Sequence, residues 1–370
     1  DAQLEQGLVA TPYIETGATT AQAGILENTP RFDYSGGATC PSLLLEPSRT
    51  NVLEYSEYFD SSYYTKASGT SLDFGYLAPD GTNSAYKLSG NTASIYAPSV
   101  IDSSYSRSIW ARTTSGTGTA QLLSYFGNTN NIFNITEEWQ RFEVSSLTVS
   151  TGDLNFYAAD LRGVSTLDEI IIWGGQAENA SYATSYIPTY GVSQTRVTDI
   201  CGITNISSSI IDTSTAHSGF IEVKSGASTG AGAWTFGIDD GTYTNYIKVK
   251  QDTTSGRNLF IARAGGSSFT SPTGGINTFS KFAWTYDGAG VLKYFIDGVL
   301  TNTNSITFPS MSNFGFGEKA GFAQFDTSFT KQALLFPTAL SDLDAAILTG
   351  ATTYNTFAAM ALALNYTVYE

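Results

Sequence analysis

The chain has 370 residues, of which 41% are hydrophobic and only 14% are charged, and its formal net charge is −15. This negative charge repels a phosphate backbone, so we expect no nucleic-acid partner. No apolar run reaches the ~18 residues that a membrane-spanning helix needs, so we also expect no membrane insertion. The 36 Gly, 22 Tyr and 22 Phe residues are typical of short strands and tight turns.

An internal repeat opens the chain: residues 1–16 align with residues 174–189 without a gap. The second copy follows an apolar run at 167–173, which indicates a buried strand. The repeat is therefore interpreted as the closing strand of a β module with its exit. Since the first copy lacks the module that it should close, residues 1–50 are predicted to be an N-terminal strand remnant and connector in a modular array.

The first copy of the repeat also predicts an interaction. A strand that exposes Leu4, Leu8 and Val9 without paired neighbours invites pairing with another chain. We expect that residues 1–16 contact either another protomer or a lost upstream domain, and that the chain forms a homo-oligomer.

Two cysteines, Cys40 and Cys201, are too few for a disulfide scaffold or a zinc site. They flank the middle module, and the first and last strands of a β-sandwich often lie side by side. We expect either a disulfide between Cys40 and Cys201 or two buried free thiols.

Residues 51–190 are predicted to form a β-sandwich of the jelly-roll type, because many short strands follow one another without a long helical period. The strand at 106–112 alternates, with Ile109 and Ala111 on one face. Its other face carries three side chains: Ser108, Trp110 and Arg112.

A linker at 191–204 is predicted to lead into a second sandwich at 205–350. Asp-Gly pairs at 240–241, 287–288 and 297–298 lie between apolar runs, as hairpin turns do.

Helical signals are confined to the end of the chain. Ser341 followed by Asp344 predicts a helix N-cap, and Gly350 ends that helix. Residues 351–370 are predicted to be a C-terminal helix and tail. The predicted fold class is therefore all-β, with two tandem β-sandwich domains and a short helical C-terminus.

The second sandwich resembles the laminin-G-like, concanavalin A-like jelly roll. The resemblance depends on three stretches, 282–288, 294–298 and 339–342, which read FAWTYDG, YFIDG and ALSD. Concanavalin-type glycosidases carry a Glu-x-Asp-x-x-Glu strand, and residues 205–350 contain no such string.

The middle module resembles carbohydrate-binding-module jelly rolls through residues 55–59, 110–112 and 138–142, which read YSEYF, WAR and EWQRF. The order of the modules is similar to tail and fibre proteins of bacteriophages, notably those of Bacteroidetes hosts. This resemblance implies a place on the virion surface, contacts with other virion proteins, and a homotrimer.

Candidate catalytic residues are few. His217 is the only histidine, and neither a Gly-x-Ser-x-Gly elbow nor a third orienting group accompanies it. Four acids at turns are interpreted as turn formers, with calcium ligation as the alternative: Asp239, Asp240, Asp287 and Asp297. We expect no enzyme activity. We also expect no cofactor, with Ca²⁺ at these turn acids as the alternative, and the metal content is left open.

Tryptophan and tyrosine rings are the candidate ligand-binding residues, since sugar sites use flat aromatic faces. Trp139 and Trp284 lie among alternating apolar neighbours and Trp173 ends an apolar run, so all three are predicted to be core residues. The candidates for glycan stacking are Trp110, Trp234, Tyr243 and Tyr246. Packing in the core or at its rim is the alternative for each of these four.

The first hypothesis is a non-enzymatic adhesion module of a phage tail or head fibre that binds host cell-surface glycans. The alternatives are a structural virion decoration protein without a specific ligand, a polysaccharide depolymerase, and a secreted bacterial adhesin located extracellularly.

Overall fold

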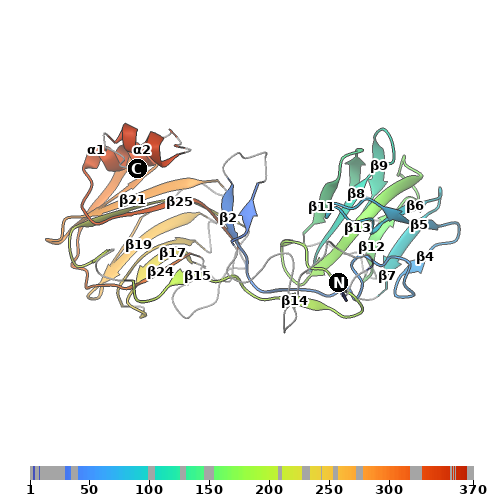
Figure 1. Cartoon of the computed structure of the whole chain (residues 1–370), viewed down its shortest axis with the longest axis horizontal. Helices are drawn as coiled ribbons and strands as arrows, with labels where there is room; N and C mark the ends of the chain where they lie inside the picture. The colour runs from blue at the N-terminus through green and yellow to red at the C-terminus, as the bar shows by residue number, and fades with distance from the viewer. Residues whose placement is uncertain are drawn as a thin grey trace. The chain divides into compact units, whose positions relative to one another are not determined.

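The computed structural model describes residues 3, 4, 8, 30–34, 41–98, 105–125, 131–145, 154–206, 211–226, 234–242, 244–252, 257–271, 278–316, 327–350, 352, 354 and 356–364. The chain divides into two compact units, one of residues 1–26 and 49–197 and the other of residues 27–48 and 198–370 (Figure 1). Strands dominate both units, and two short helices lie near the C-terminus. The predicted all-β fold class is confirmed.

The first unit contains two five-stranded antiparallel sheets among its described residues. One has the order β11 (Gln140–Val144), β8 (Ser106–Arg112), β13 (Glu169–Glu178), β6 (Ala85–Ser89) and β5 (Ser71–Tyr76). The other has the order β10 (Ile132–Ile135), β9 (Gly118–Gln121), β12 (Phe156–Asp160), β7 (Ser94–Ala97) and β4 (Thr65–Lys66). A two-stranded sheet pairs β14 (Gln194–Arg196) with β3 (Arg49–Asn51).

A hydrophobic core lies between the two five-stranded sheets. It takes Ile109 and Ile172 from one sheet and Ile95 and Phe156 from the other, all fully buried. Each such side chain contributes about 1.5–3 kcal/mol through burial. The alternation predicted for residues 106–112 is confirmed, since Ile109 and Ala111 face this core while Trp110 faces outward.

The second unit stacks a seven-stranded sheet on a six-stranded one (Figure 1). The larger has the order β1 (Phe32–Asp33), β2 (Ser42–Leu45), β25 (Ser328–Phe336), β16 (His217–Ser225), β21 (Ser280–Tyr286), β22 (Val291–Ile296) and β23 (Val299–Ser305). The smaller has the order β15 (Cys201–Ile203), β24 (Asn313–Phe316), β17 (Trp234–Asp239), β18 (Tyr246–Gln251), β19 (Asn258–Ala264) and β20 (Ser267–Thr270).

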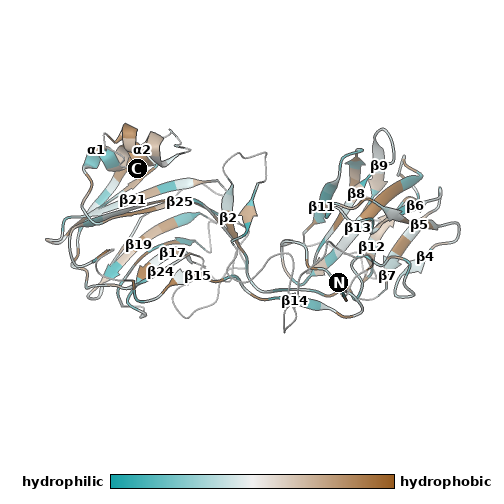
Figure 2. Ribbon diagram, viewed as in Figure 1, coloured by the Kyte–Doolittle hydropathy of each residue, from teal (hydrophilic) through white to brown (hydrophobic). Residues whose placement is uncertain are grey.

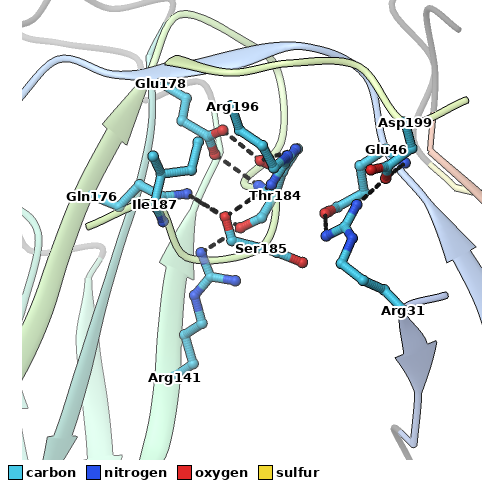
Figure 3. Close-up of polar contacts among 10 residues, drawn as sticks. All are labelled: Arg31, Glu46, Arg141, Gln176, Glu178, Thr184, Ser185, Ile187, Arg196 and Asp199. Atoms are coloured by element: carbon cyan, nitrogen blue, oxygen red, sulfur yellow. Dashed lines mark hydrogen bonds and ion pairs between the residues drawn. The ribbon is translucent and has the colours of Figure 1, made fainter. Parts of the chain in front are cut away.

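Strands β2 and β15 come from segments that the sequence analysis assigned to a connector and a linker. Strand β2 pairs with β25, and β15 pairs with β24 at the edge of the smaller sheet. Arg31 reinforces this region through ion pairs with Glu46, at 2.6 Å, and with Asp199 (Figure 3). Both short segments therefore belong to the second unit.

The disulfide prediction is not settled by these strands. Cys201 lies half-buried in β15, while Cys40 lies outside the described residues. A disulfide between Cys40 and Cys201 and two buried free thiols therefore both stay open as predictions.

The core of the second unit surrounds Trp284, which is fully buried as predicted. Gly219 lies opposite Trp284 in the strand pair β16–β21, and a Cβ atom at that position would overlap the indole ring. Glycine at position 219 therefore leaves the space that the Trp284 ring occupies.

Two helices, α1 (Asp342–Thr349) and α2 (Phe357–Ala363), pack on the other face of the seven-stranded sheet (Figure 1). The Asp344 backbone N–H donates to the Ser341 hydroxyl at 3.1 Å, which confirms the predicted N-cap. No helix among the described residues is long and apolar enough to cross a bilayer.

Candidate functional site

The candidate site is an aromatic patch on the outer face of the β11–β8–β13–β6–β5 sheet, on the side opposite to the core of the first unit. Its buried members are Ala78, Ala85, Ile171 and Trp173, and its half-buried members are Tyr76, Trp110, Trp139 and Tyr186. Figure 2 shows the hydrophobic colouring along β13, which supplies Ile171 and Trp173. We call these eight residues the aromatic patch.

Strand register brings the three tryptophans together. Trp173 of β13 is paired with Trp110 of β8, and Trp110 is paired on its other side with Arg141 of β11. Trp139 directly precedes β11 and donates its indole N–H to the Leu77 carbonyl at 3.2 Å. Strand pairing therefore places Trp173 and Trp110 side by side, and Trp139 joins the same cluster from the residue before β11.

Trp173 anchors the patch. Its indole N–H donates to the Ser84 hydroxyl at 2.8 Å, and its ring centre lies 4.6 Å from that of Tyr186. Gly174 adopts a positive φ of 65°, and a Cβ atom there would lie 3.2 Å from Trp110 and 3.3 Å from Tyr186. Glycine at this position therefore permits both the backbone conformation and the close approach of the two rings.

Cationic side chains lie over the rings of the patch. The guanidinium carbon of Arg112 is 5.3 Å from the Trp139 ring centre, and Lys87 Nζ is 5.9 Å from the Tyr76 ring centre. The pKa of Lys87 is raised, and the hydrogen bond with Tyr76 is the largest cause. These contacts bring hydrogen-bond donors next to the aromatic rings.

Acidic groups balance the cations at the edge of the patch. Lys87 Nζ lies 3.5 Å from Asp73 and 3.8 Å from Glu169, and Arg141 Nη1 lies 3.2 Å from Glu143. The patch therefore combines aromatic faces with paired charges and carries no large excess of positive charge.

The positions predicted for the tryptophans of the first unit can be compared with the structure. Trp110 faces outward with Ser108 and Arg112, as predicted, and its buried indole N–H has no hydrogen-bond partner among the described residues. The prediction that Trp139 is a core residue is wrong, because Trp139 is half-buried in the aromatic patch. Trp173 is buried as predicted, but under this outer patch rather than between the sheets.

The other candidate rings lie in the second unit. Trp234 and Tyr246 are both buried in a small cluster with Ile261, and Lys248 Nζ lies 4.0 Å and 4.1 Å from the two ring centres. Tyr243 lies outside the described residues. A glycan-stacking role for these three residues stays a prediction.

His217 is buried in β16 of the second unit. Its Nδ1 atom lies 2.9 Å from the Thr215 carbonyl oxygen, and its ring packs against Tyr286 and Phe308. Burial lowers the pKa of His217. Neither Tyr286 nor Phe308 is a serine or cysteine that His217 could activate as a nucleophile.

The acids at the predicted turns accept backbone N–H groups. Asp239 accepts from Gly241 at 2.7 Å, Asp287 accepts from Ala289 at 2.8 Å, and Asp297 accepts from Lys281 at 3.0 Å. The Asp-Gly hairpins predicted at 240–241, 287–288 and 297–298 join paired strands, as expected. Within the described residues, no three His, Cys, Asp or Glu side chains gather to hold a metal ion, and the Ca²⁺ alternative stays a prediction.

The chain is similar in part to several solved structures. The carbohydrate-binding module CBM40 of a Ruminococcus gnavus sialidase, bound to α2,6-sialyllactose, is 14% identical, with 37% of this chain and 84% of that chain covered and a TM-score of 0.32. Domain 4 of AbnA, a GH43 extracellular arabinanase of Geobacillus stearothermophilus in complex with arabinotriose, is 14% identical, with 36% and 68% covered and a TM-score of 0.30. A leech intramolecular trans-sialidase is 16% identical, with 42% and 28% covered and a TM-score of 0.33.

At these identities and TM-scores, we draw no conclusion about this chain from the likenesses. No protein-family model matches the chain, and no curated protein matches it.

Proposed function

We propose that the protein is a non-enzymatic adhesion protein that binds cell-surface glycans through the aromatic patch of its first sandwich. The observation that carries this proposal is that Trp110 and Trp139 lie half-buried on one outer sheet face, in the same cluster as the buried Trp173. The apolar face of a pyranose stacks on such rings, while neighbouring donors bind its hydroxyl groups.

The half-buried members of the patch are the ones that would contact a sugar. Trp139 and Tyr76 contribute aromatic rings, and Arg112, whose guanidinium lies over the Trp139 ring, contributes a hydrogen-bond donor. Because Lys87 and Arg141 are already paired with acids and the whole chain carries a net charge of −15, a neutral glycan suits this face better than a polyanion.

A binding role is favoured over catalysis because His217 and several of the carboxylates are already buried, hydrogen-bonded or ion-paired. His217 is enclosed in the second unit, and Asp239 and Asp287 accept hydrogen bonds from the backbone of their own turns. Glu143 and Glu169 at the edge of the patch are paired with Arg141 and Lys87. A glycosidase needs two carboxylates that remain available on either side of one glycosidic bond.

We place this binding protein on the virion surface, in a tail or head fibre, on the strength of its sequence resemblance to phage fibre proteins. In that setting it would contact other virion proteins and form a homotrimer. Mass photometry of the chain tests the trimer, and its detection in purified virions tests the location. A secreted bacterial adhesin would instead be found in culture medium free of virions.

A glycan array with the wild-type chain tests the binding function. Bound polysaccharides are then incubated with the protein, and new reducing ends are counted. Selective binding without new reducing ends supports the adhesion function. New reducing ends identify a depolymerase, and an array without any signal identifies a decoration protein without a glycan ligand; either result overturns the proposal.

A further inference from the structure

One row of paired residues crosses the outer face of the β11–β8–β13–β6–β5 sheet and has a cationic side chain on each side of Ile171. Ile171 of β13 is paired with Arg112 of β8 and with Lys87 of β6. The Arg112 guanidinium lies over the Trp139 ring, and Lys87 Nζ lies 5.9 Å from the Tyr76 ring centre. Because neighbouring strands are about 4.8 Å apart, the backbones of the two cationic residues are separated by about 10 Å.

Only the Lys87 end of this row also carries acidic and hydroxyl side chains. Lys87 is paired on its other side with Asp73 of β5. Glu169, which lies two residues from Ile171 on β13 and so shares its face, accepts a hydrogen bond from the Thr114 hydroxyl. These four residues, Asp73, Lys87, Glu169 and Thr114, lie on or beside four neighbouring strands and are here called the polar strip.

The charged groups of the polar strip are accessible and only loosely paired. The side chains of Lys87, Asp73 and Glu169 are 22%, 55% and 38% exposed. Lys87 Nζ lies 3.5 Å from Asp73 and 3.8 Å from Glu169, which is longer than the roughly 2.9 Å of a charge-assisted hydrogen bond. An ammonium group has three donors and a carboxylate about four acceptor sites, so the strip keeps hydrogen-bonding capacity for a ligand.

A neutral sugar residue matches this combination of groups. Each sugar hydroxyl both donates and accepts, so it can donate to Asp73 or Glu169 and accept from Lys87. Two carboxylates and one ammonium group leave the strip with an excess of negative charge, and the whole chain carries −15. An anionic sugar is therefore disfavoured.

We propose that the polar strip is a second subsite, so that the ligand of the first sandwich is a neutral oligosaccharide and not a single sugar. The inference rests on the proposed function, in which one sugar residue stacks on Trp139 beside Arg112. An adjoining residue then bonds through its hydroxyls to Lys87, Asp73 and Glu169. Three strand spacings separate the backbones of Arg112 and Asp73, about 14 Å, and two linked sugar residues span this distance where one does not.

The length of the oligosaccharide distinguishes the second subsite from the aromatic patch. Oligosaccharides of one to four residues are prepared from the glycan selected on the array. Each is titrated calorimetrically into the wild type, the double variant Asp73→Ala/Glu169→Ala and the control Asp60→Ala. Asp60 is an exposed carboxylate paired with Lys66 of the other five-stranded sheet, so it controls for the loss of an ion-paired acid. Exposed ion pairs contribute little to stability, so the variants should melt close to the wild type.

We expect the wild type to bind the longer oligosaccharides about tenfold or more tighter than the single sugar, because they add hydrogen bonds to charged groups. The double variant should lose this increase in affinity, and Asp60→Ala should keep it. A double variant that keeps the full increase, or a wild type that shows none, overturns the second subsite and leaves the proposed function intact. A wild type that binds no oligosaccharide of any length overturns the proposed function, and the second subsite with it.

Discussion

The guanidinium carbon of Arg112 lies 5.3 Å from the centre of the Trp139 ring, on the outer face of a sheet whose inner face forms the core of the first sandwich. Arg112 comes from β8, whereas Trp139 precedes β11, so the contact joins two neighbouring strands at the rim of the aromatic patch. The pairing of β8 with β11 therefore brings Arg112 close to Trp139, the ring that we propose as a sugar contact.

Gly174→Ala tests how closely the patch is packed. Alanine at a φ of 65° costs about 1–2 kcal/mol, and its Cβ would additionally press on Trp110 and Tyr186. Gly116→Ala is the matched control, because Gly116 has a φ of 67° with no atom within 4 Å of the added Cβ. Denaturant unfolding should show a greater loss of unfolding free energy for Gly174→Ala, by about 1–3 kcal/mol. Equal losses of unfolding free energy in the two variants would mean that Trp110 and Tyr186 move aside without a cost.

The pH dependence of the second sandwich should report His217, the only histidine of the chain. Burial lowers the pKa of His217 below its ordinary value of 6.5, so the unfolded chain takes up a proton that the folded chain excludes. Stability is therefore fully present above pH 6.5 and is lost as the pH falls toward the folded pKa, with a slope of at most about 1.4 kcal/mol per pH unit.

The measurement is thermal unfolding of the wild type and of His217→Gln between pH 8 and pH 5. Asp212 is the charged group that faces His217, and it is unchanged in the variant. The variant should lose less stability than the wild type over this range. Parallel curves for the two proteins would contradict the assignment.

Glu57 should give the stability of the first sandwich the opposite pH dependence. Burial is the main cause that raises its pKa above the ordinary 4.5, and the charge of Asp80 adds to the effect, while Tyr186 and Tyr190 donate hydrogen bonds that lower it. The stability linked to Glu57 is fully present below pH 4.5 and is lost as the pH rises through the folded pKa.

Glu57→Gln removes this charge and keeps an oxygen that accepts from Tyr186. The variant should melt at a higher temperature than the wild type at pH 7, and the advantage should disappear near pH 4. A Glu57→Gln variant that is less stable at pH 7 would show that the ionised carboxylate stabilises the fold.

Local patterns in the sequence predicted a good part of the architecture. The alternation in 106–112 placed Trp110 on the outer face, the Asp-Gly pairs marked hairpins, and Ser341 marked the start of α1. Each of these signals depends on a few neighbouring residues, so no knowledge of the distant chain was required.

Features that depend on distant partners could not be predicted in this way. Strand β2 pairs Leu43 with Thr330, far along the chain, so its membership in the second unit is not visible locally. Trp139 lies just before its strand, where the turn and not the alternation sets its direction. A register shift between Trp234 and Phe236 similarly turns Trp234 out of the alternating pattern and over Gly237.

The most direct test of the glycan-binding function is calorimetric titration of the glycan selected on the array into the wild type, Trp139→Ala and Tyr96→Ala. Tyr96 is half-buried and stacks on Tyr157 in the other five-stranded sheet, so it controls for the loss of a ring elsewhere on the same sandwich. We predict that Trp139→Ala raises the Kd roughly tenfold or more, about 1.4 kcal/mol, while Tyr96→Ala binds as the wild type does. Unchanged affinity in a folded Trp139→Ala variant would contradict the account.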